Sequence, residues 1–496
     1  MSPHEFDLLL LAVGALLLVA VGAVRASTKI GVPSLLAYLG LGVALGESGA
    51  GIRFDDAQLA QHLGLAALVV ILAEGGLSAH WPSTRSAIPV AVSLSTVGVA
   101  LSTVVTAGAL RLLTGMEWRV ALILGAIVSS TDAAAIFSTL RGLRLRRSLS
   151  SVLEVESGTN DPLVVIAVVA LSTVDGDHHI GTIVLHGLLE MGVGLGVGVV
   201  LGHLGAAALR NAALPAAGLY PLAVLATTVL AYGVASILAG SGFLAVYVTA
   251  ITMGRNRLPH QQATRAVVEG LGWLSQIGLF VMLGLLVSPG EIGGALAPAV
   301  IASAVLLFVA RPVSVLVAAA WALRPAELVF VSWAGLRGAV PIVFATIPVT
   351  FEVPGSEGLV EIVFVMIVLL TLVQGPTLPA VARRCGALEG AGLSDLRVES
   401  APLESVSADL LDLRIPVGSR MAGSTIRGLR LPDGALVTLV VRGDRTFVPD
   451  DTTILRESDQ LLVVATEAVR IRTERRLRAV SRNGELAGWL GDDGAE

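Results

Sequence analysis

The chain has 496 residues, of which 54% are hydrophobic and 14% are charged, and its formal net charge is -5. Because soluble domains carry about 25% charged residues, this composition excludes an ordinary soluble protein and indicates a polytopic membrane protein. Cys385 is the only cysteine, so an intrachain disulfide is excluded as well.

Long apolar stretches predict where the chain crosses the membrane, because a spanning helix needs about 17 to 25 such residues. In chain order, we expect thirteen spans, at residues 8–24, 32–45, 63–80, 88–113, 120–140, 149–174, 183–209, 220–239, 243–254, 268–287, 296–323, 328–348 and 359–381. The second and ninth are the shortest. We therefore expect an all-α polytopic membrane domain of about 13 helices.

The loops between these stretches differ in charge. One set carries most of the basic residues: Arg25, Lys29, Arg85, Arg141, Arg144, Arg146, Arg147, Arg210, Arg255, Arg257, Arg265 and Arg324. The other set carries only Arg53, Arg111 and Arg119. Because basic loops stay in the cytoplasm, we expect the N-terminus outside and the C-terminus in the cytoplasm, in an inner or plasma membrane.

From about Leu388 onward, charged and polar residues become frequent and the long apolar stretches stop. Short strands are expected at residues 409–415, 436–442, 452–455 and 460–465. We expect a transmembrane domain at 1–387, a small cytoplasmic α+β domain at 388–480, and a disordered polar tail at 481–496.

Two interrupted stretches suggest an internal repeat. Residues 129–132 (S-S-T-D) lie in the middle of the fifth predicted span, and residues 335–341 (G-L-R-G-A-V-P) lie in the middle of the twelfth. Each is followed by one more span, so we expect two inverted six-helix repeats joined by the seventh span. Paired broken helices of this kind indicate the midplane site of a transporter.

Charged residues inside a membrane cost at least a few kcal/mol each and are seldom there without a function. Those deepest in the predicted spans are Asp132, Glu156, Asp161, Arg311 and Arg337, and Glu74 lies nearer the inner end of the third. Glu154, Glu190 and Glu361 lie closer to span ends and indicate less. Neutral oxygens nearby come from Thr131, Ser157 and Asn160. Monovalent cations bind several oxygen ligands of these kinds.

The segment at 156–162 divides its side chains between two helix faces. Ser157 and Asp161 are four residues apart and share one face, whereas Glu156 and Asn160 share the adjacent face. We expect the first face to hold an ion and the second to pair with a buried arginine.

The seventh stretch carries a glycine series and two histidines. Gly194, Gly198 and Gly202 are spaced four apart and predict close helix packing. We expect His186 and His203 to be packed or lining positions, with a role in pH sensing as the alternative.

Five segments of the predicted membrane domain carry recognisable motifs. Residues 156–162 read E-S-G-T-N-D-P, residues 130–135 read S-T-D-A-A-A, and residues 335–339 read G-L-R-G-A. Residues 311–312 read R-P, and residues 74–77 read E-G-G-L. Together they resemble the E-S-x-x-N-D-P, T-D-P-V-A-V, G-L-R-G-A, R-P and E-G-G-L motifs of the first family of monovalent cation/proton antiporters. The likeness extends over nearly all of the predicted membrane domain.

The resemblance implies where protons and cations bind. Asp161 would be the carboxylate that binds either the proton or the cation, and Asp132, Thr131, Ser157 and Glu74 would complete the cation site. These residues are therefore the expected exchange site.

The resemblance also implies structural roles. Glu156 would form a buried ion pair with Arg311 rather than with Arg337. This pair, together with Asn160 and Arg337, would orient the crossing helices. Ala133 stands where the family carries proline. Because alanine favours continuous helix, the way in which the fifth helix breaks stays open.

The cytoplasmic part carries further recognisable segments, at residues 417–419, 426–429, 436–437, 441–443 and 458–463. They resemble the C-terminal half of regulator-of-potassium-conductance domains (RCK-C, also called TrkA-C). No Gly-rich dinucleotide motif occurs, so we expect the nucleotide-binding N-terminal half of such units to be absent. The ligand of this domain stays open, with a small molecule such as a nucleotide as one candidate. Within the family, such a domain implies potassium/proton exchange under cytoplasmic control, and the family implies a homodimer.

We therefore expect a secondary antiporter, not an enzyme, that exchanges K⁺ for H⁺, with Na⁺ or Li⁺ as the alternative cation. Since Asn160 and not a second acid stands beside Asp161, the exchange is expected to be electroneutral. No cofactor is expected, and the partners are ions and the lipid bilayer rather than nucleic acid. A gated cation channel would need a filter like T-V-G-Y-G, and a membrane enzyme would need a motif such as H-E-x-x-H or G-x-S-x-G; the sequence has none of these.

Overall fold

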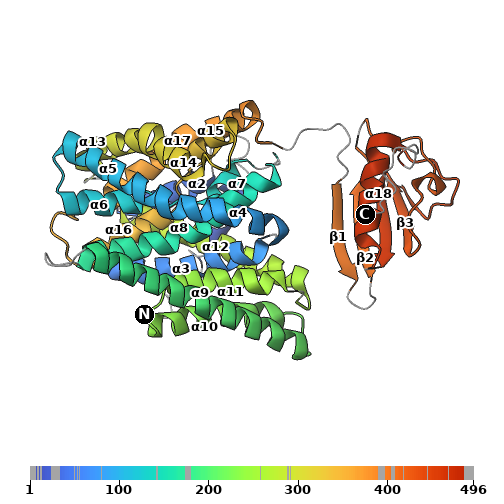
Figure 1. Cartoon of the computed structure of the whole chain (residues 1–496), viewed down its shortest axis with the longest axis horizontal. Helices are drawn as coiled ribbons and strands as arrows, with labels where there is room; N and C mark the ends of the chain where they lie inside the picture. Colours follow the sequence, from blue (N-terminus) through green and yellow to red (C-terminus); the bar gives the residue numbers. More distant parts are fainter. Residues whose placement is uncertain are drawn as a thin grey trace. The chain divides into compact units, whose positions relative to one another are not determined.

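The computed structural model divides into two compact units, Met1–Glu389 and Gly390–Glu496 (Figure 1). It describes residues 7, 11, 14–23, 34–47, 49, 51–52, 54, 56–79, 81–140, 143, 145–173, 180–256, 258–287, 290, 292–388, 397–403, 408–416, 418–443, 445–466, 468–484 and 487. Some of the basic residues used to orient the chain, namely Arg25, Lys29, Arg53, Arg141, Arg144 and Arg257, lie outside the described residues.

The first unit is built from helices. In chain order these are a helix at Gly14–Ala23, α2 (Ser34–Leu45), α3 (Ala57–Ser78), α4 (Trp81–Ser93), α5 (Val99–Thr114), α6 (Trp118–Ile127), α7 (Ala133–Thr139), α8 (Arg147–Thr173), α9 (Ile180–Asn211), α10 (Leu219–Ile237), α11 (Gly242–Arg255), α12 (Gln261–Leu286), α13 (Ile292–Val305), α14 (Arg311–Ala319), α15 (Pro325–Trp333), α16 (Val340–Thr350) and α17 (Leu359–Arg384). In the described part of the chain, eight helical segments are long and apolar enough to cross a membrane, and five shorter apolar helices accompany them. The all-α polytopic class is thereby confirmed, while the count of thirteen crossings stays a prediction.

These helices pack into two groups. One group, called here the α3 bundle, contains α2, α3 and α9–α12, which contact one another extensively. The other, the α8 bundle, contains α4–α8 and α13–α17. The two bundles meet where α16 packs on α3 and where α8 packs on α11 and α9. At this seam α16 is buried from Val340 to Pro348, so the seam lies deep inside the protein.

Four helices of the α8 bundle are interrupted in pairs. The π-helical segments η1 (Leu94–Gly98) and η2 (Leu306–Ala310) separate α4 from α5 and α13 from α14, in the fourth and eleventh predicted stretches. The breaks between α6 and α7 and between α15 and α16 lie in the fifth and twelfth. The two π-helical segments are thus seven predicted stretches apart, and so are the two breaks. This spacing is expected of two six-helix halves that are joined by the seventh stretch.

The predicted glycine series brings α9 close to α11. A Cβ atom added at Gly198 would lie 2.8 Å from Val248 Cβ, and one at Gly202 would lie 2.6 Å from Thr252 Cβ. Gly194 is equally close to backbone atoms at the start of α11. These distances are shorter than van der Waals contact, so the prediction of close packing is confirmed.

The second unit is a small α+β domain. Its antiparallel sheet has the strand order β1-β2-β5-β3-β4, from β1 (Arg397–Leu403), β2 (Ala408–Arg414), β3 (Ala435–Arg442), β4 (Arg445–Phe447) and β5 (Gln460–Thr466). Helix α18 (Arg470–Asn483) lies across one face of this sheet (Figure 1). The core between them contains Leu411, Val463, Leu477 and Val480, which are fully buried.

Three strands of the sheet match predicted ones, but the strand expected at 452–455 is wrong. This stretch pairs only at Ile454, in an isolated bridge with Thr425. The carboxylate of Asp450 accepts hydrogen bonds from Thr452 and Thr453, and such local side-chain bonds favour a turn over a strand. The short strands β1 and β4 were not expected.

Helix α18 extends beyond Ser481, the residue at which we expected the polar tail to begin. Ser481 is fully buried, and its hydroxyl lies 2.8 Å from that of Ser419 in a hydrogen bond. The first residues of the expected tail therefore belong to the folded domain. From residue 485 onward, only Ala487 is among the described residues.

Candidate functional site

The first broken helix places a carboxylate at the start of α7. The Ser-Ser-Thr run at 129–131 competes with the backbone for hydrogen bonds and ends α6. Asp132 then adopts extended backbone angles, and its Oδ1 accepts hydrogen bonds from the amides of Ala134 (2.9 Å) and Ala135 (3.3 Å). A capped half-helix thus begins at Ala133 without the proline of the family motif.

The second broken helix lies directly against the first. Asp132 donates its backbone amide to the carbonyl of Leu336 in the gap between α15 and α16 (2.9 Å). A Cβ atom at Gly338 would lie 1.9 Å from Asp132 Oδ2. A glycine at this position is therefore what lets the gap approach the carboxylate. Pro341 then lies in the first turn of α16.

Arg337 joins the carbonyl ends of both broken helices. Its Nε donates to the Val128 carbonyl at the end of α6 (2.6 Å), and its Nη1 donates to the Gly335 carbonyl just after α15. The residue is only 2% exposed. Because helix C-termini carry partial negative charge, one guanidinium stabilises two helix ends that a membrane would otherwise leave unsatisfied.

Helix α8 passes the first break with the polar side chains of its central motif. The Ser130 hydroxyl donates a hydrogen bond to Asp161 Oδ1. Asn160 Nδ2 donates to Thr131 Oγ1 (2.7 Å). Ser157 Oγ donates to the Thr131 carbonyl (2.8 Å) and accepts from a backbone amide of α7 (3.2 Å). The broken segment is therefore held to α8 by side chains of both helices.

Glu156 and Arg311 form a buried ion pair on another face of α8. The two guanidinium nitrogens Nη1 and Nη2 lie 2.5 Å and 3.1 Å from the two carboxylate oxygens. Glu156 is 0% exposed and Arg311 is 5% exposed. Of the two arginines considered for this pair, Arg311 is thus the partner, and Arg337 is bonded elsewhere.

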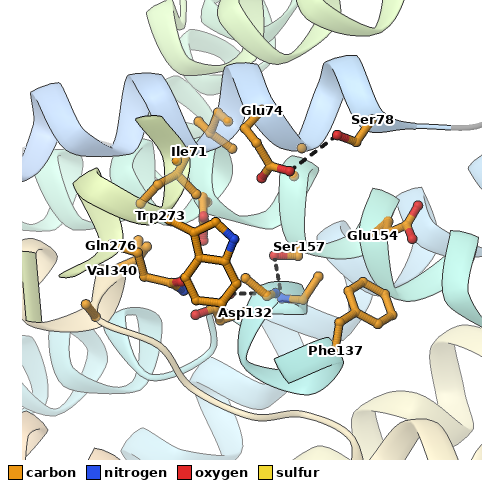
Figure 2. A pocket seen from close by; sticks show the side chains of 18 of the residues that line it. Ile71, Glu74, Ser78, Asp132, Phe137, Glu154, Ser157, Trp273, Gln276 and Val340 are labelled. Atoms are coloured by element: carbon orange, nitrogen blue, oxygen red, sulfur yellow. Dashed lines mark hydrogen bonds between the residues drawn. The ribbon is translucent and has the colours of Figure 1, made fainter. Parts of the chain in front are cut away.

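A cavity of about 380 Å³ lies at the seam between the bundles. Helices α7, α8 and α16 line it from one bundle, and α3, α11 and α12 line it from the other. Its polar lining residues are Glu74, Ser78, Asp132, Glu154, Ser157, Asp161, Tyr247, Glu269, Trp273 and Gln276. Figure 2 shows Glu74 on one side of this space and Asp132 and Ser157 on the other.

The cavity is acidic. Five carboxylates line it, from Glu74, Asp132, Glu154, Asp161 and Glu269, and no basic side chain is among the described lining residues. Glu269 is exposed, whereas Asp161 is only 4% exposed. Acidic side chains therefore line the cavity from the surface to a buried carboxyl group, an arrangement that favours cations over anions.

Four of the five residues expected to bind the ion meet in this cavity. Asp161, Asp132, Ser157 and Glu74 line it together. Thr131 is not among the described residues that line it, and its hydroxyl accepts a hydrogen bond from Asn160. The residues expected to orient helices, namely Asn160, Glu156, Arg311 and Arg337, lie outside the cavity lining.

Several polar residues of the site are not among those expected from the sequence, and three of them bear on its charge or on Asp161. Ser130 belongs to a recognised motif, and its hydroxyl bonds to Asp161. Glu154 lies near a span end, but it precedes Asp161 by seven residues and so shares its helix face. Glu269 shares a face of α12 with Gln276 by the same spacing, and this signal was available in the sequence.

Comparisons with known proteins agree with the two units. A family model described as "Sodium/hydrogen exchanger, transmembrane" matches residues 15–384, and one described as "TrkA-C domain" matches residues 410–478. Both lie within the compact units of the structure.

Curated relatives match most of the chain. A protein from Alkalimonas amylolytica named "K(+)/H(+) antiporter NhaP" is 34% identical over 94% of this chain and 82% of its own length. A protein from Shewanella baltica named "K(+)/H(+) antiporter NhaP2" is 33% identical over the same shares.

A solved structure has a similar fold. The sodium proton antiporter MjNhaP1 from Methanocaldococcus jannaschii at pH 8 superimposes with a TM-score of 0.63. It is 21% identical and covers 74% of this chain and 99% of its own. At this identity the likeness concerns the fold of the helical unit.

Proposed function

This chain belongs to the sodium/hydrogen exchanger family, and from that membership we propose that it is a secondary antiporter that exchanges K⁺ for H⁺. The observation that carries the proposal is the position of Asp161, a buried carboxylate that lines an acidic cavity between two helix bundles. A carboxylate in such a place binds either a proton or a metal cation, and it has little other use at membrane depth.

Asp161 is the proposed exchange carboxylate because it is free to change partners. Its neighbour Asp132 is tied to the start of α7 by two backbone amides. Asp161 accepts from one hydroxyl, that of Ser130, and a hydroxyl can rotate when a cation replaces a proton. Asp132 and Ser157 would supply further oxygens to the cation.

Glu74 and Thr131 complete the proposed cation site in different ways. Glu74 reaches the cavity from the opposite bundle, so it would bind the cation before the bundles move. Thr131 would act through its carbonyl and hydroxyl, which position Ser157 and Asn160. The hydrogen bonds of Asn160, of Arg337 and of the pair of Glu156 with Arg311 support the orienting roles proposed for them.

Exchange would follow from movement of one bundle against the other. The cation and the proton compete for one carboxylate, so each crossing carries one or the other. Because Asn160 contributes no second exchangeable proton, we propose an electroneutral exchange of one cation for one proton. The protein moves ions and performs no chemical conversion of a substrate.

Potassium is the proposed cation because the relatives that match most of the chain are named K⁺/H⁺ antiporters. Sodium or lithium stays the alternative, since the family as a whole is described as a sodium/hydrogen exchanger. We further propose a membrane exchanger domain at 1–387 and a regulatory domain at 388–480, with a small molecule such as a nucleotide as a candidate ligand of the latter.

Charge asymmetry of the loops supports an outer N-terminus and a cytoplasmic C-terminus in the cell membrane. The first cavity would then open to the cytoplasm, because Ser78 at the end of α3 and Glu269 near the start of α12 lie at its exposed part. A homodimer is proposed from the likeness to the family.

Proton flux into proteoliposomes tests the proposal, with K⁺, Na⁺ and Li⁺ titrated separately. We expect K⁺ to drive proton movement without generating a membrane potential, and Asp161→Asn to abolish it. The matched control is Glu117→Gln, which removes an exposed acid of the same unit that lines neither cavity described here. Full exchange by Asp161→Asn would refute the assignment, and cation flux without a counter-ion would indicate a channel.

A further inference from the structure

A second cavity lies at the same seam, between α8 of one bundle and α9–α11 of the other. It measures about 420 Å³ and is lined by the C-terminal half of α8 together with parts of α9, α10 and α11. The first cavity is lined by the N-terminal half of α8. The two cavities therefore approach the centre of α8 from opposite ends.

One helical turn separates the two cavities. On α8, Asp161 lines the first and Val165 lines the second; on α11, Tyr247 lines the first and Phe243 lines the second. Four residues of α-helix span about 6 Å. The exchange carboxylate is thus about one turn from a second space that the proposed function does not use.

Aromatic rings line each cavity near this turn, Tyr247 in the first and Phe243 in the second. A Cβ atom at Gly158 would lie 2.2 Å from a ring carbon of Tyr247, so the tyrosine ring rests directly on the α8 backbone. Phe243 is 5% exposed and packs edge-on against Tyr232, with ring centroids 5.1 Å apart.

The second cavity contains its own ionisable pair. His186 and Glu190 are four residues apart on α9, both line the cavity, and they are close enough to interact electrostatically. Tyr232 of α10 is the other titratable lining residue; α8 and α11 contribute none among the described lining residues. An acid and a base that line a cavity at membrane depth indicate that water or ions reach this cavity.

We propose that the second cavity is the access route from the aqueous phase opposite the first, and that His186 and Glu190 form an ion-binding station within it. This inference rests on the proposed function and adds the residues that cations and protons meet on that side. Glu190 attracts the cation, and His186 controls how strongly it does so.

The control follows from the charge of the pair. An imidazole gains its charge between about pH 8 and pH 5. Neutral His186 leaves the pair with the single negative charge of Glu190, whereas protonated His186 cancels that charge. Acidification of this phase therefore weakens the attraction for the cation there, independently of proton competition at Asp161.

Right-side-out and everted membrane vesicles containing the full-length protein test the station, with pH varied only in the outer medium. For the face with the second cavity, His186→Gln should lower the KM for K⁺ about 3-fold near pH 6 and leave it unchanged near pH 8.5. Glu190→Gln should raise that KM about 3-fold near pH 8.5. This is the effect of removing one negative charge about 10 Å from the bound cation, at an effective dielectric constant of about 50. The opposite face should show neither change.

The matched control is His203→Gln on the same helix, since His203 lines neither cavity and bonds to the backbone carbonyl of Val199. If the parent protein shows no exchange in either vesicle type, the proposed function fails and takes this inference with it. If the parent exchanges but His186→Gln has the parental pH profile on both faces, the inference alone is overturned.

Thiol labelling tests the access route without relying on transport. In a Cys385→Ser background, Val169→Cys reports on the second cavity and Ile71→Cys on the first. A charged, membrane-impermeant thiol reagent should modify the two cysteines from opposite faces of the membrane. Modification of both from one face, or no modification of Val169→Cys from either, would overturn the proposal, the latter because the cavity would then be sealed or filled by lipid.

Discussion

Gly338→Ala is the substitution whose effect the structure defines most closely. Gly338 is not in the left-handed region of backbone angles, so alanine is not excluded by backbone conformation. Its added Cβ would instead lie 1.9 Å from Asp132 Oδ2 and 2.6 Å from Asp132 Cγ. Ordinary contact begins at about 3.4 Å, so the carboxylate or the gap must move by about 1.5 Å.

Such a displacement should weaken cation binding far more than folding. A misplacement of about 1 Å in a site can cost about 100-fold in function, so we expect the KM for K⁺ to rise about 10- to 100-fold, which corresponds to about 1.4 to 2.7 kcal/mol. The assay is cation-driven proton flux in proteoliposomes, with thermal unfolding to check that the variant folds. Gly278→Ala is the control, since no atom lies within 4 Å of its added Cβ. An unchanged KM in a folded Gly338→Ala protein would refute the placement of Asp132 at the cation site.

Three further predictions concern charge. Arg311→Met leaves Glu156 buried without its partner and should lower the free energy of unfolding by about 3–5 kcal/mol; denaturant unfolding in detergent measures this, and adding Glu156→Gln should restore part of it. Glu269→Gln at the exposed part of the first cavity should raise the KM for K⁺ about 2-fold at low ionic strength and lose its effect when an inert salt is added; an effect that persists in salt would contradict a long-range role. Asp459→Asn should weaken the cytoplasmic domain by about 2 kcal/mol. The hydrogen bonds to Asp459 raise the pKa of Arg442. A raised pKa stabilises the fold fully at any pH below the pKa that the group has in the unfolded chain, so the loss of stability in Asp459→Asn should be equal at about pH 6 and about pH 9. A loss of stability at only one of these pH values would contradict this origin.

Local sequence patterns were enough to predict most helical stretches of the first unit and two of its breaks. Small or hydroxyl-bearing residues predicted the gap before Asp132 and the gap around Gly338, whereas the π-helical segments η1 and η2 were not expected. These features are encoded within one turn of helix, so no knowledge of the tertiary fold was needed. The turn at Asp450 was misread as part of a strand, because its side-chain hydrogen bonds compete with β pairing.

Contacts between distant segments were harder to predict. The Ser157–Asp161 face was expected to hold an ion, but the pairing of Asn160 with Thr131 depends on how close α8 passes to the break. The contribution of α12 to the cavity, through Glu269, depends on bundle packing that a single sequence does not specify. The second cavity with His186 likewise exists only because four helices meet there.

The most direct test of the exchange carboxylate is proton release upon cation binding. Purified protein in weakly buffered detergent solution is titrated with K⁺ while the pH of the medium is recorded, because a metal ion that binds a protonated ligand displaces its proton. We predict that the parent protein releases about one proton per chain at saturation and that Asp161→Asn releases none. Equal proton release by both proteins, or K⁺ binding to the parent without any proton release, would contradict competition at Asp161.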